Sequence, residues 1–275
     1  MTSEAVVGVA PVVRMAPVVR VAPVVRMAMW SGPRNLSTAL MRAWENRPDT
    51  MVIDEPLYAY YLAQTGLDHP GRDEIVATYP AEPDAAIARC LAPVPAGIEV
   101  VYQKHMTHHL LPGLDRRWLE QLRHVMLIRD PIQVLASYTR VRETVTLSEI
   151  GLVQQQELAE RTEMIIDADD FLGQPRAYLE ALCQSLDLPF DDHMLHWPAG
   201  RRDSDGCWAP YWYSSVEAST GFGPPRSTAP DVGDPGFESE SERINRLPAH
   251  LRALAGQAME IYRSLGEARL VLPPP

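Results

Sequence analysis

One segment near the start of the chain constrains the fold more than any other. Residues 24–30 (VVRMAMW) are apolar and β-branched enough to form a buried strand, and residues 31–38 (SGPRNLST) hold Gly, Pro, Asn and hydroxyl side chains. Apolar residues then recur at helical spacing, at Leu40, Met41, Ala43 and Trp44. A strand, a tight loop and a helix start in this order build an anion site, because the first N–H groups of a helix lack internal partners and its dipole favours negative charge there.

Three side chains of this loop add to the anion site. Arg34 brings a permanent positive charge with a planar fork of donors, and Ser37 and Thr38 bring hydroxyl donors at the helix start. The segment therefore predicts a phosphate or sulfate cradle. It is not a Walker A motif, G-x-x-x-x-G-K-[ST], because the second glycine is absent and an arginine stands where a lysine is expected. A Gly-Pro turn that only caps a helix is the alternative interpretation.

Strand-like runs alternate with helix-like segments along the chain. Strands are expected at 24–30, 50–53, 98–103, 125–128 and 164–168, and helices at 37–46, 57–65, 83–91, 131–142, 147–160, 175–186 and 247–265. This alternation predicts an α/β fold in three layers, with a mostly parallel central sheet flanked by helices on both faces. Polar and charged residues follow the expected strand ends, which is the edge where open α/β sheets bind ligands.

The chain is expected to form one domain over residues 23–275, because no linker divides it. Residues 1–22 are expected to be a poorly ordered extension: a six-residue motif that begins Ala-Pro-Val-Val-Arg occurs three times from Ala10 onward. A proline in each copy breaks helices and limits sheet pairing. Residues 200–238 are rich in Gly, Pro, Ser and aromatic residues, and are expected to form a long loop region that covers a site.

Composition restricts the possible partners and location. A net charge of −11 argues against a general nucleic-acid binder, so an anion site would be a local basic pocket in an acidic protein. No run approaches the roughly 20 uninterrupted apolar residues of a membrane span. The cysteines Cys90, Cys183 and Cys207 lack metal-type spacing, which indicates reduced thiols in a cytoplasmic protein.

Two further motifs carry basic residues. Arg129 ends an expected strand and Ser137 stands eight residues later on the following helix, so the two can clamp one phosphate. Asp130 and Pro131 between them fit ordinary helix capping, which explains neither Arg129 nor Ser137. Residues 201–208 (RRDSDGCW) bring two arginines, a glycine and a tryptophan, and a solvated basic loop is the alternative for this segment.

The order and spacing of these motifs resemble those of sulfotransferases that use 3′-phosphoadenosine 5′-phosphosulfate (PAPS). The Pro-Arg-x-x-Ser-Thr loop is similar to the 5′-phosphosulfate loop of the tyrosylprotein and bacterial members. Residues 201–208 resemble the motif Arg-Lys-Gly-x-x-Gly-x-Trp, with Asp203 in place of a glycine. The resemblance covers residues 24 to about 222 and implies a P-loop-like sulfotransferase fold, PAPS as co-substrate and no metal.

The same resemblance assigns cofactor-binding roles. It implies that Arg34 and the backbone of residues 35–38 bind the 5′-phosphosulfate, and that an Arg…Ser pair and the Gly-x-Trp segment bind the 3′-phosphate and the adenine. The implied cofactor-binding residues are Arg34, Asn35, Leu36, Ser37, Thr38, Arg129, Ser137, Arg201, Arg202, Gly206 and Trp208.

An acceptor hydroxyl or amine needs a general base, and the resemblance offers two. Glu55 follows the second expected strand, where tyrosylprotein sulfotransferases carry a catalytic Glu. His105 stands at the same distance before Leu-Leu-Pro as the catalytic His of cytosolic sulfotransferases. His105 is preferred because a His titrates near neutrality unaided, whereas Glu55 needs a pKa raised by burial. Lys104 is the candidate for stabilising charge on the leaving phosphate, with a solvated strand end as the alternative.

The sequence therefore predicts a transferase that moves a sulfuryl group from PAPS to a hydroxyl or amine of a small-molecule acceptor. A P-loop-type kinase or nucleotide hydrolase is the first alternative, although the loop lacks the lysine such an enzyme needs. A non-catalytic nucleotide-binding protein of the same fold is the second. The sequence names neither the acceptor nor the oligomeric state.

Overall fold

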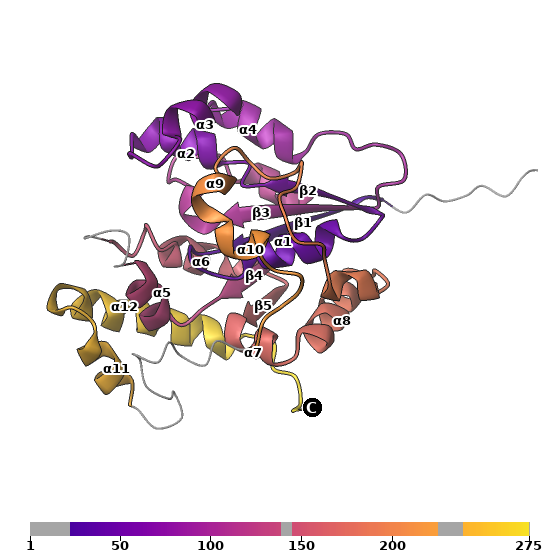
Figure 1. Ribbon diagram of the computed structural model, residues 1–275. Coiled ribbons are helices and arrows are strands. Elements are labelled where there is room, and N and C mark those ends of the chain that lie inside the picture. The colour runs from indigo at the N-terminus through magenta and orange to yellow at the C-terminus, as the bar shows by residue number, and fades with distance from the viewer. Residues whose placement is uncertain (1–22, 139–144, 225–238, 275) are drawn as a thin grey trace, which may run out of the picture.

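The computed structural model describes residues 23–138, 145–224 and 239–274. Its helices and strands are arranged as Figure 1 shows. In chain order they are β1 (Val25–Ser31), α1 (Ser37–Glu45), β2 (Thr50–Asp54), α2 (Tyr58–Thr65), α3 (Arg72–Thr78), α4 (Pro83–Cys90), β3 (Val100–Met106), η1 (Thr107–His109), η2 (Arg117–Gln121), β4 (Arg123–Ile128), α5 (Pro131–Tyr138), α6 (Leu152–Leu158), η3 (Ala159–Arg161), β5 (Met164–Asp167), α7 (Ala168–Gly173), α8 (Pro175–Ser185), η4 (Asp192–Leu195), α9 (Ala209–Trp212), α10 (Ser214–Glu217), α11 (Glu240–Arg246) and α12 (Ala249–Glu267).

The strands form one sheet in which all neighbours run parallel. Their order is β2-β3-β1-β4-β5, so β1 lies in the centre with β3 and β4 on its two sides. Because all the strands point the same way, their carboxyl ends lie along one edge of the sheet. The predicted α/β fold with a parallel sheet is confirmed, and the segments that follow β1, β2, β3 and β4 meet at this edge.

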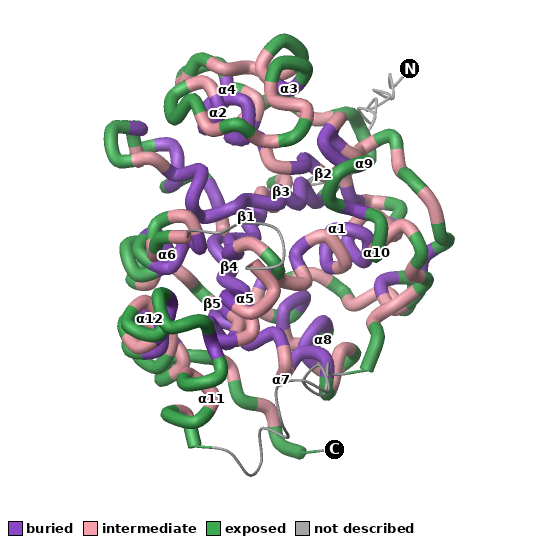
Figure 2. Tube along the Cα trace, turned by 60° about the vertical axis from the view of Figure 1, so that its left-hand side comes forward, coloured by how far each residue is buried: buried purple, intermediate pink, exposed green. Residues whose placement is uncertain are grey.

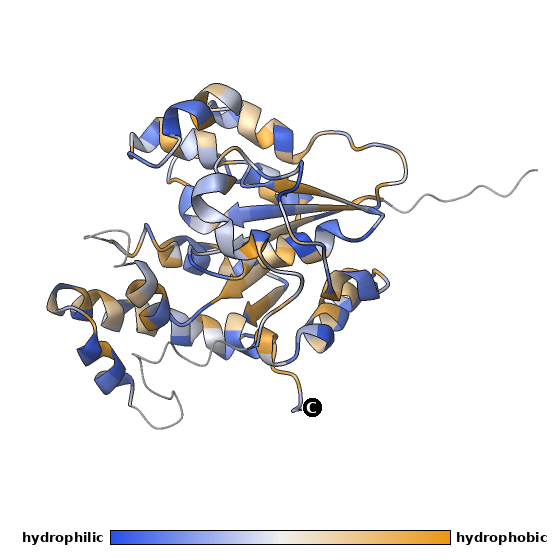
Figure 3. Cartoon of the chain, in the orientation of Figure 1, coloured by the Kyte–Doolittle hydropathy of each residue, from blue (hydrophilic) through white to orange (hydrophobic). Residues whose placement is uncertain are grey.

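Strand residues alternate between two apolar layers, because successive side chains of a strand point to opposite faces. Met27 and Met29 of β1 pack in the layer that holds α1, α2 and α8. Ala28 and Trp30 pack in the layer that holds α4, α6 and part of α12. Figure 2 shows the strands as the buried centre of the molecule, and Figure 3 shows that this centre is largely hydrophobic. The sheet is therefore covered on both faces.

Most element boundaries lie within two residues of the sequence prediction, and within the described residues two of them differ by three residues or more. Strand β3 runs on to Met106 instead of ending at Gln103, so Lys104 and His105 belong to the strand and do not follow it. The helix expected to start at Leu147 begins at Leu152 as α6. Gly151 precedes it with φ at 78°, and a Cβ there would lie 2.2 Å from Oγ1 of Thr107, so close backbone contact with η1 fixes the helix start.

Some sequence predictions lie outside the described residues. These are the N-terminal extension of residues 1–22, the end of the helix expected at 131–142, and residues 225–238 of the expected covering loop. Within the described ranges, no helix is both long and apolar enough to cross a membrane.

Candidate functional site

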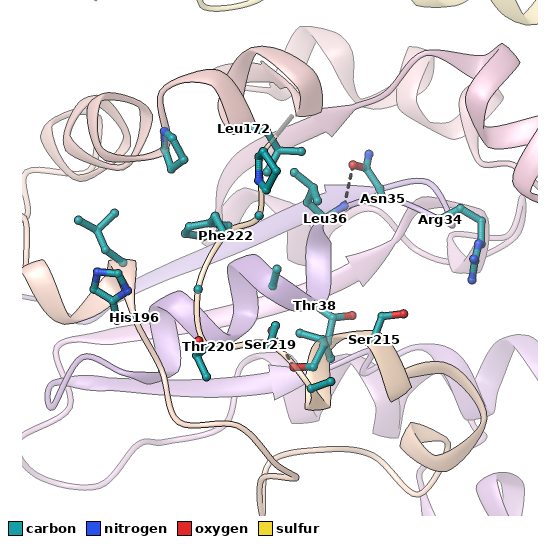
Figure 4. A pocket seen from close by; sticks show the side chains of 18 of the residues that line it. Arg34, Asn35, Leu36, Thr38, Leu172, His196, Ser215, Ser219, Thr220 and Phe222 are labelled. Carbon is teal, nitrogen blue, oxygen red and sulfur yellow. Dashed lines mark hydrogen bonds between the residues drawn. The ribbon is translucent and has the colours of Figure 1, made fainter. Parts of the chain in front are cut away.

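The segment between β1 and α1 forms a tight loop that the neighbouring strand holds in place. We call residues 31–38 the anion loop. Asn35 donates its Nδ2–H to the carbonyl of Leu127 at the end of β4 (3.1 Å), and its Oδ1 accepts the N–H of Leu36 (2.8 Å; Figure 4). Arg34 adopts a left-handed backbone conformation with φ at 59°, which is uncommon for a residue other than glycine. The loop is thus pinned to the sheet, with the N–H groups at the start of α1 facing its open side.

Two arginines and a serine from distant parts of the chain meet at this loop. Nε of Arg34 donates to Oγ of Ser137 on α5 at 2.9 Å. Arg129, which follows β4, donates from its guanidinium to the carbonyl of Arg34 and to Oε1 of Gln133. The structure therefore brings the predicted anion loop and the predicted Arg129–Ser137 pair into one surface. Its donors are guanidinium groups, a hydroxyl and backbone N–H groups, which together suit an anion.

A large cavity of about 850 Å³ opens beside this surface. Arg34, Asn35, Leu36 and Thr38 line one side of it, together with Arg129 and Ser137. The rest of the lining comes from segments that the motifs did not single out (Figure 4). It includes Leu172, Arg176, His196, Ser215, Val216, Ser219, Thr220 and Phe222. A signal for this wall exists in the hydroxyl- and glycine-rich run 214–223, which lies in the region expected to cover a site.

The Gly-x-Trp segment lies elsewhere, which corrects the expectation that residues 201–208 close over a nucleotide. Trp208 is fully buried in the core, and the N–H of Gly206 donates to Oδ2 of Asp54. The Arg201 guanidinium lies 3.8 Å from Glu217, and Arg202 donates to the carbonyl of Pro198. None of the four predicted residues of this segment lines the large cavity.

A buried ion pair explains why this segment is held in the core. Arg42 on α1 and Asp205 are both almost fully buried, and Nη1 of Arg42 lies 2.6 Å from Oδ1 of Asp205. Breaking such a pair would leave an uncompensated buried charge, so the pair fixes the segment against α1. The charge at Asp205 thus has a structural partner inside the protein.

A small cavity of about 170 Å³ lies on the other side of the anion loop. Its lining shares Arg34, Asn35, Thr38 and Trp212 with the large cavity. The other lining residues are Pro33, Ser37, Glu55, Tyr58, His69, Lys104, Met106, His108, His109, Tyr138 and Tyr213. Two cavities that meet at an anion loop can bring two molecules together at one bound anion.

Lys104, the only lysine of the chain, organises a buried polar cluster at the floor of the small cavity. Its Nζ lies 3.1 Å from Oδ1 of Asp54, 2.6 Å from Oε1 of Glu55 and 2.5 Å from the hydroxyl of Tyr213. Burial alone would lower the pKa of Lys104, but the charges of Asp54 and Glu55 outweigh it and raise the pKa above its ordinary value. An ammonium has three N–H donors, so these three contacts use all of them.

Glu55 stands at the point where β2 turns away from the sheet. Its φ is 35°, and its N–H donates to the carbonyl of Lys104, which holds the turn against β3. Burial raises the pKa of the Glu55 carboxyl, although the charge of Lys104 opposes the shift. Burial thus shifts the Glu55 carboxyl in the direction that a glutamate base would need.

His105 faces the other side of the sheet, which corrects its predicted place in the site. Its ring stacks on Trp30 with centroids 4.3 Å apart, and Nε2 lies 3.0 Å from Oε1 of Gln103. It does not line the small cavity. Burial lowers its pKa to about 3, so the imidazole is neutral. The reason is the longer β3, because the alternation that turns Lys104 toward Glu55 turns His105 away.

Two other histidines, His108 and His109 of η1, line the small cavity instead. The His109 ring stacks on Tyr58 with centroids 4.8 Å apart and an interplanar angle of 4°. Its Nδ1 lies 4.0 Å from Oε2 of Glu55. Burial lowers the pKa of His109 well below its usual range, with a smaller contribution from His108.

Comparison with known proteins identifies the family. A sequence model described as a sulfotransferase domain matches residues 25–238. Two Arabidopsis thaliana proteins, branched-chain-amino-acid aminotransferase-like proteins 1 and 2, are 37% and 36% identical over 203 residues. The match covers 72% of this chain but only 36% of each of those proteins, so this chain spans about a third of their length.

Solved structures agree on the fold. The sulfotransferase domain of the Synechococcus PCC 7002 olefin synthase superposes with a TM-score of 0.51 at 18% identity, covering 91% of this chain and 96% of that domain. A sulfotransferase from Alicyclobacillus acidocaldarius gives a TM-score of 0.51 at 13% identity, covering 91% and 98%. With the family match over most of its length, the P-loop-like fold and an anion loop at the end of β1, this chain belongs to the sulfotransferase family.

Proposed function

We propose that the protein transfers a sulfuryl group from PAPS to a hydroxyl or amine of a small acceptor. The observation that carries the proposal is the pair of cavities that share Arg34, Asn35, Thr38 and Trp212. A donor in one cavity and an acceptor in the other would meet at these residues. Bringing two reactants together in a fixed orientation is the main contribution a protein makes to such a transfer.

The large cavity suits the nucleotide. Arg34 and the N–H groups at the start of α1 would bind the 5′-phosphosulfate, since a helix start and a guanidinium both favour an anion. Arg129 and Ser137 would bind the 3′-phosphate, because they lie on the same surface. Phe222 and Leu172, which line the same cavity, offer apolar contact for the adenine.

The small cavity suits the acceptor, and Glu55 is the base that its geometry favours. Glu55 would take the proton of the acceptor as the acceptor oxygen or nitrogen forms its bond to sulfur. The bond from sulfur to the bridging phosphate oxygen breaks, and its electron pair leaves with the nucleotide. Arg34 would stabilise the charge that develops between donor and acceptor. Lys104 would hold Glu55 in place, because its three donors are used by Asp54, Glu55 and Tyr213.

The donor assignment can be tested by calorimetry. We expect micromolar binding of 3′-phosphoadenosine 5′-phosphate and none of ATP with Mg²⁺. Preference for ATP with Mg²⁺ would instead favour a kinase or nucleotide hydrolase. Transfer is then measured as radioactive sulfate moved from labelled PAPS to a panel of small phenols, alcohols and amines, with and without added metal. Absence of transfer to every acceptor, together with absence of nucleotide binding, would overturn the proposal.

A further inference from the structure

The two oxygens of the Glu55 carboxyl group have different neighbours. Oε1 accepts a hydrogen bond from the ammonium of Lys104 (2.6 Å), and Oε2 lies 4.0 Å from Nδ1 of His109. Other groups that act on the carboxyl are Asp54 on β2 and the hydroxyl of Tyr213 after α9. One oxygen therefore faces a cation, and the other faces an imidazole.

His109 is held rigidly in this position. Its ring lies parallel to Tyr58, and the Tyr61 ring packs beside it with centroids 4.7 Å apart. Both tyrosines belong to α2, which begins three residues after Glu55, so the segment that carries the carboxyl also fixes the imidazole. A ring packed in this way keeps Nδ1 near Glu55, so little further conformational freedom is lost when a hydrogen bond forms.

Nδ1 of His109 is a buried polar atom, and no described residue gives it a hydrogen-bond partner. Buried polar atoms without partners are rare in folded proteins, because each costs about 1–3 kcal/mol relative to a hydrogen-bonded one. Burial keeps the imidazole neutral. With the proton on Nε2, Nδ1 of a neutral imidazole is a hydrogen-bond acceptor, and the atom that it faces is Oε2 of Glu55.

We propose that His109 is a positioning residue for the proton transfer, and that its Nδ1 accepts a hydrogen bond from Oε2–H once Glu55 has taken the proton of the acceptor. This rests on the proposed function of Glu55 as the base. The acceptor O–H or N–H bond breaks and an O–H bond forms on Glu55, while His109 gains no proton. For this contact Oε2 and Nδ1 must approach from 4.0 Å to hydrogen-bond length. Lys104 then stabilises the ionised carboxyl before the transfer, and His109 stabilises the neutral carboxyl after it.

Three variants test the proposal. His109→Phe keeps a flat ring between the tyrosines but removes the nitrogen, and His109→Asn keeps a polar atom near the position of Nδ1. His105→Phe is the matched control, because it makes the same chemical change on the opposite face of the sheet. Thermal unfolding and binding of 3′-phosphoadenosine 5′-phosphate establish that each variant is folded.

We expect His109→Phe to lower kcat by about tenfold or more with KM for both substrates within about twofold, because the lost contact forms only during proton transfer. His109→Asn should recover part of the loss, and His105→Phe should keep kcat within about twofold. Equal losses in His109→Phe and His109→Asn, or a change in KM alone, would mean a structural role and overturn the proposal. Loss of activity in His105→Phe with His109→Phe unaffected would overturn both this inference and the assignment of Glu55.

Infrared spectroscopy gives a readout that needs no transfer activity. At low pH, the C=O band of protonated Glu55 is identified as the band that disappears in Glu55→Gln. We expect this band to move to higher frequency in His109→Phe, because the O–H group loses its acceptor, and to stay in place in His105→Phe. An unchanged band in His109→Phe overturns the proposal even if the enzyme is active. A shifted band in a protein that transfers no sulfuryl group would support the contact and overturn only the proposed function.

Discussion

Nε of Arg34 lies 2.9 Å from Oγ of Ser137, although 103 positions of sequence separate the two residues. The contact follows from the sheet order, because β1 and β4 are neighbours and the segments after them meet at one edge. Arg34 ends up between the large cavity, which it lines with Ser137, and the small cavity beyond the loop. One side chain therefore connects the proposed nucleotide site to the proposed acceptor site.

Replacing Arg34 by Ala should lower kcat for sulfuryl transfer by about 10²–10³-fold while the protein stays folded. The guanidinium would contact the group being transferred, and removal of a donor aimed at developing charge costs about 10²–10³ in kcat. Steady-state transfer from labelled PAPS measures the loss, and thermal unfolding measures the fold. Arg117→Ala serves as a control, because Arg117 is an exposed residue that forms an ion pair with the nearby Asp115. A kcat of Arg34→Ala close to that of the wild type would contradict the anion-loop assignment.

Replacing Arg129 by Ala should weaken binding only of nucleotides that carry a 3′-phosphate. A charge-assisted hydrogen bond contributes about 1.5–3 kcal/mol, so the dissociation constant of 3′-phosphoadenosine 5′-phosphate should rise about 10- to 150-fold. The affinity for adenosine 5′-phosphosulfate, which lacks the 3′-phosphate, should change little. Calorimetry with both ligands measures the difference. An equal loss of affinity for both ligands would show that Arg129 supports the loop through the Arg34 carbonyl and does not bind the 3′-phosphate.

Transfer should depend on the ionised form of Glu55. Burial raises the pKa of this carboxyl, so the base is lost as pH falls through a value above that of an ordinary glutamate, and the rate should rise with pH through that value. Glu55→Gln should lower kcat by about 10²–10⁴-fold and remove this acidic limb. The pH profile of kcat measures both effects. If Glu55→Gln keeps some activity and its kcat still falls at acidic pH as in the wild type, another group is the one that titrates.

Replacing Lys104 by Met should destabilise the protein by about 3–5 kcal/mol, because it leaves the buried Asp54 and Glu55 without their cation. The double variant Lys104→Met with Asp54→Asn should regain part of that loss. Denaturant unfolding of both variants measures the change. A Lys104→Met protein as stable as the wild type would show that the two carboxyls are protonated and need no cation.

The single lysine offers an independent measurement of the same cluster. Isotope labelling of lysine places one labelled side chain in the whole protein. Its ammonium should stay protonated up to pH values above 10.5, because the neighbouring carboxylates raise its pKa. Loss of the proton from the Lys104 ammonium below pH 10.5 would contradict the ion pairs with Asp54 and Glu55.

The fold could be predicted from the sequence because its strands are apolar runs separated by helical periodicity. Among the strands the largest error was at the end of β3, where the residues after Gln103 are polar and histidine-rich and do not look like a buried strand. Lys104 and His105 are buried because Lys104 pairs with Asp54 and Glu55, and His105 stacks on Trp30. These partners are distant in sequence, so the local sequence does not predict them. The error of three residues was enough to place the wrong histidine beside the cavity.

The anion loop and its partners were predictable for a different reason. Arg34 and Arg129 each follow a strand, so a parallel sheet brings them to the same edge whatever the details of packing. The wall formed by Ser219 and Phe222 has no such constraint, because it belongs to a long segment whose path depends on contacts with α7 and α8. For this segment only the content of Gly, Pro, Ser and aromatic residues predicted that it covers a site.

Arg201 and Arg202 provide a test of where the nucleotide is covered. Neither residue lines the large cavity. Arg201 lies beside Glu217, and Arg202 contacts the Pro198 carbonyl and Glu45. Arg201→Ala and Arg202→Ala should therefore leave the dissociation constant of 3′-phosphoadenosine 5′-phosphate within about twofold of the wild type, as expected for surface substitutions away from a ligand.

Phe222→Ala provides the contrast for these two variants, because Phe222 stands in the wall of the cavity. It should weaken nucleotide binding by about 1–3 kcal/mol if its ring contacts the adenine, since stacking of a base on an aromatic side chain has that magnitude. Calorimetry on all three variants compares the two segments directly. A large loss in Arg201→Ala or Arg202→Ala with none in Phe222→Ala would restore residues 201–208 as the cover. It would also require the segment to leave the core, where the ion pair of Asp205 with Arg42 now holds it.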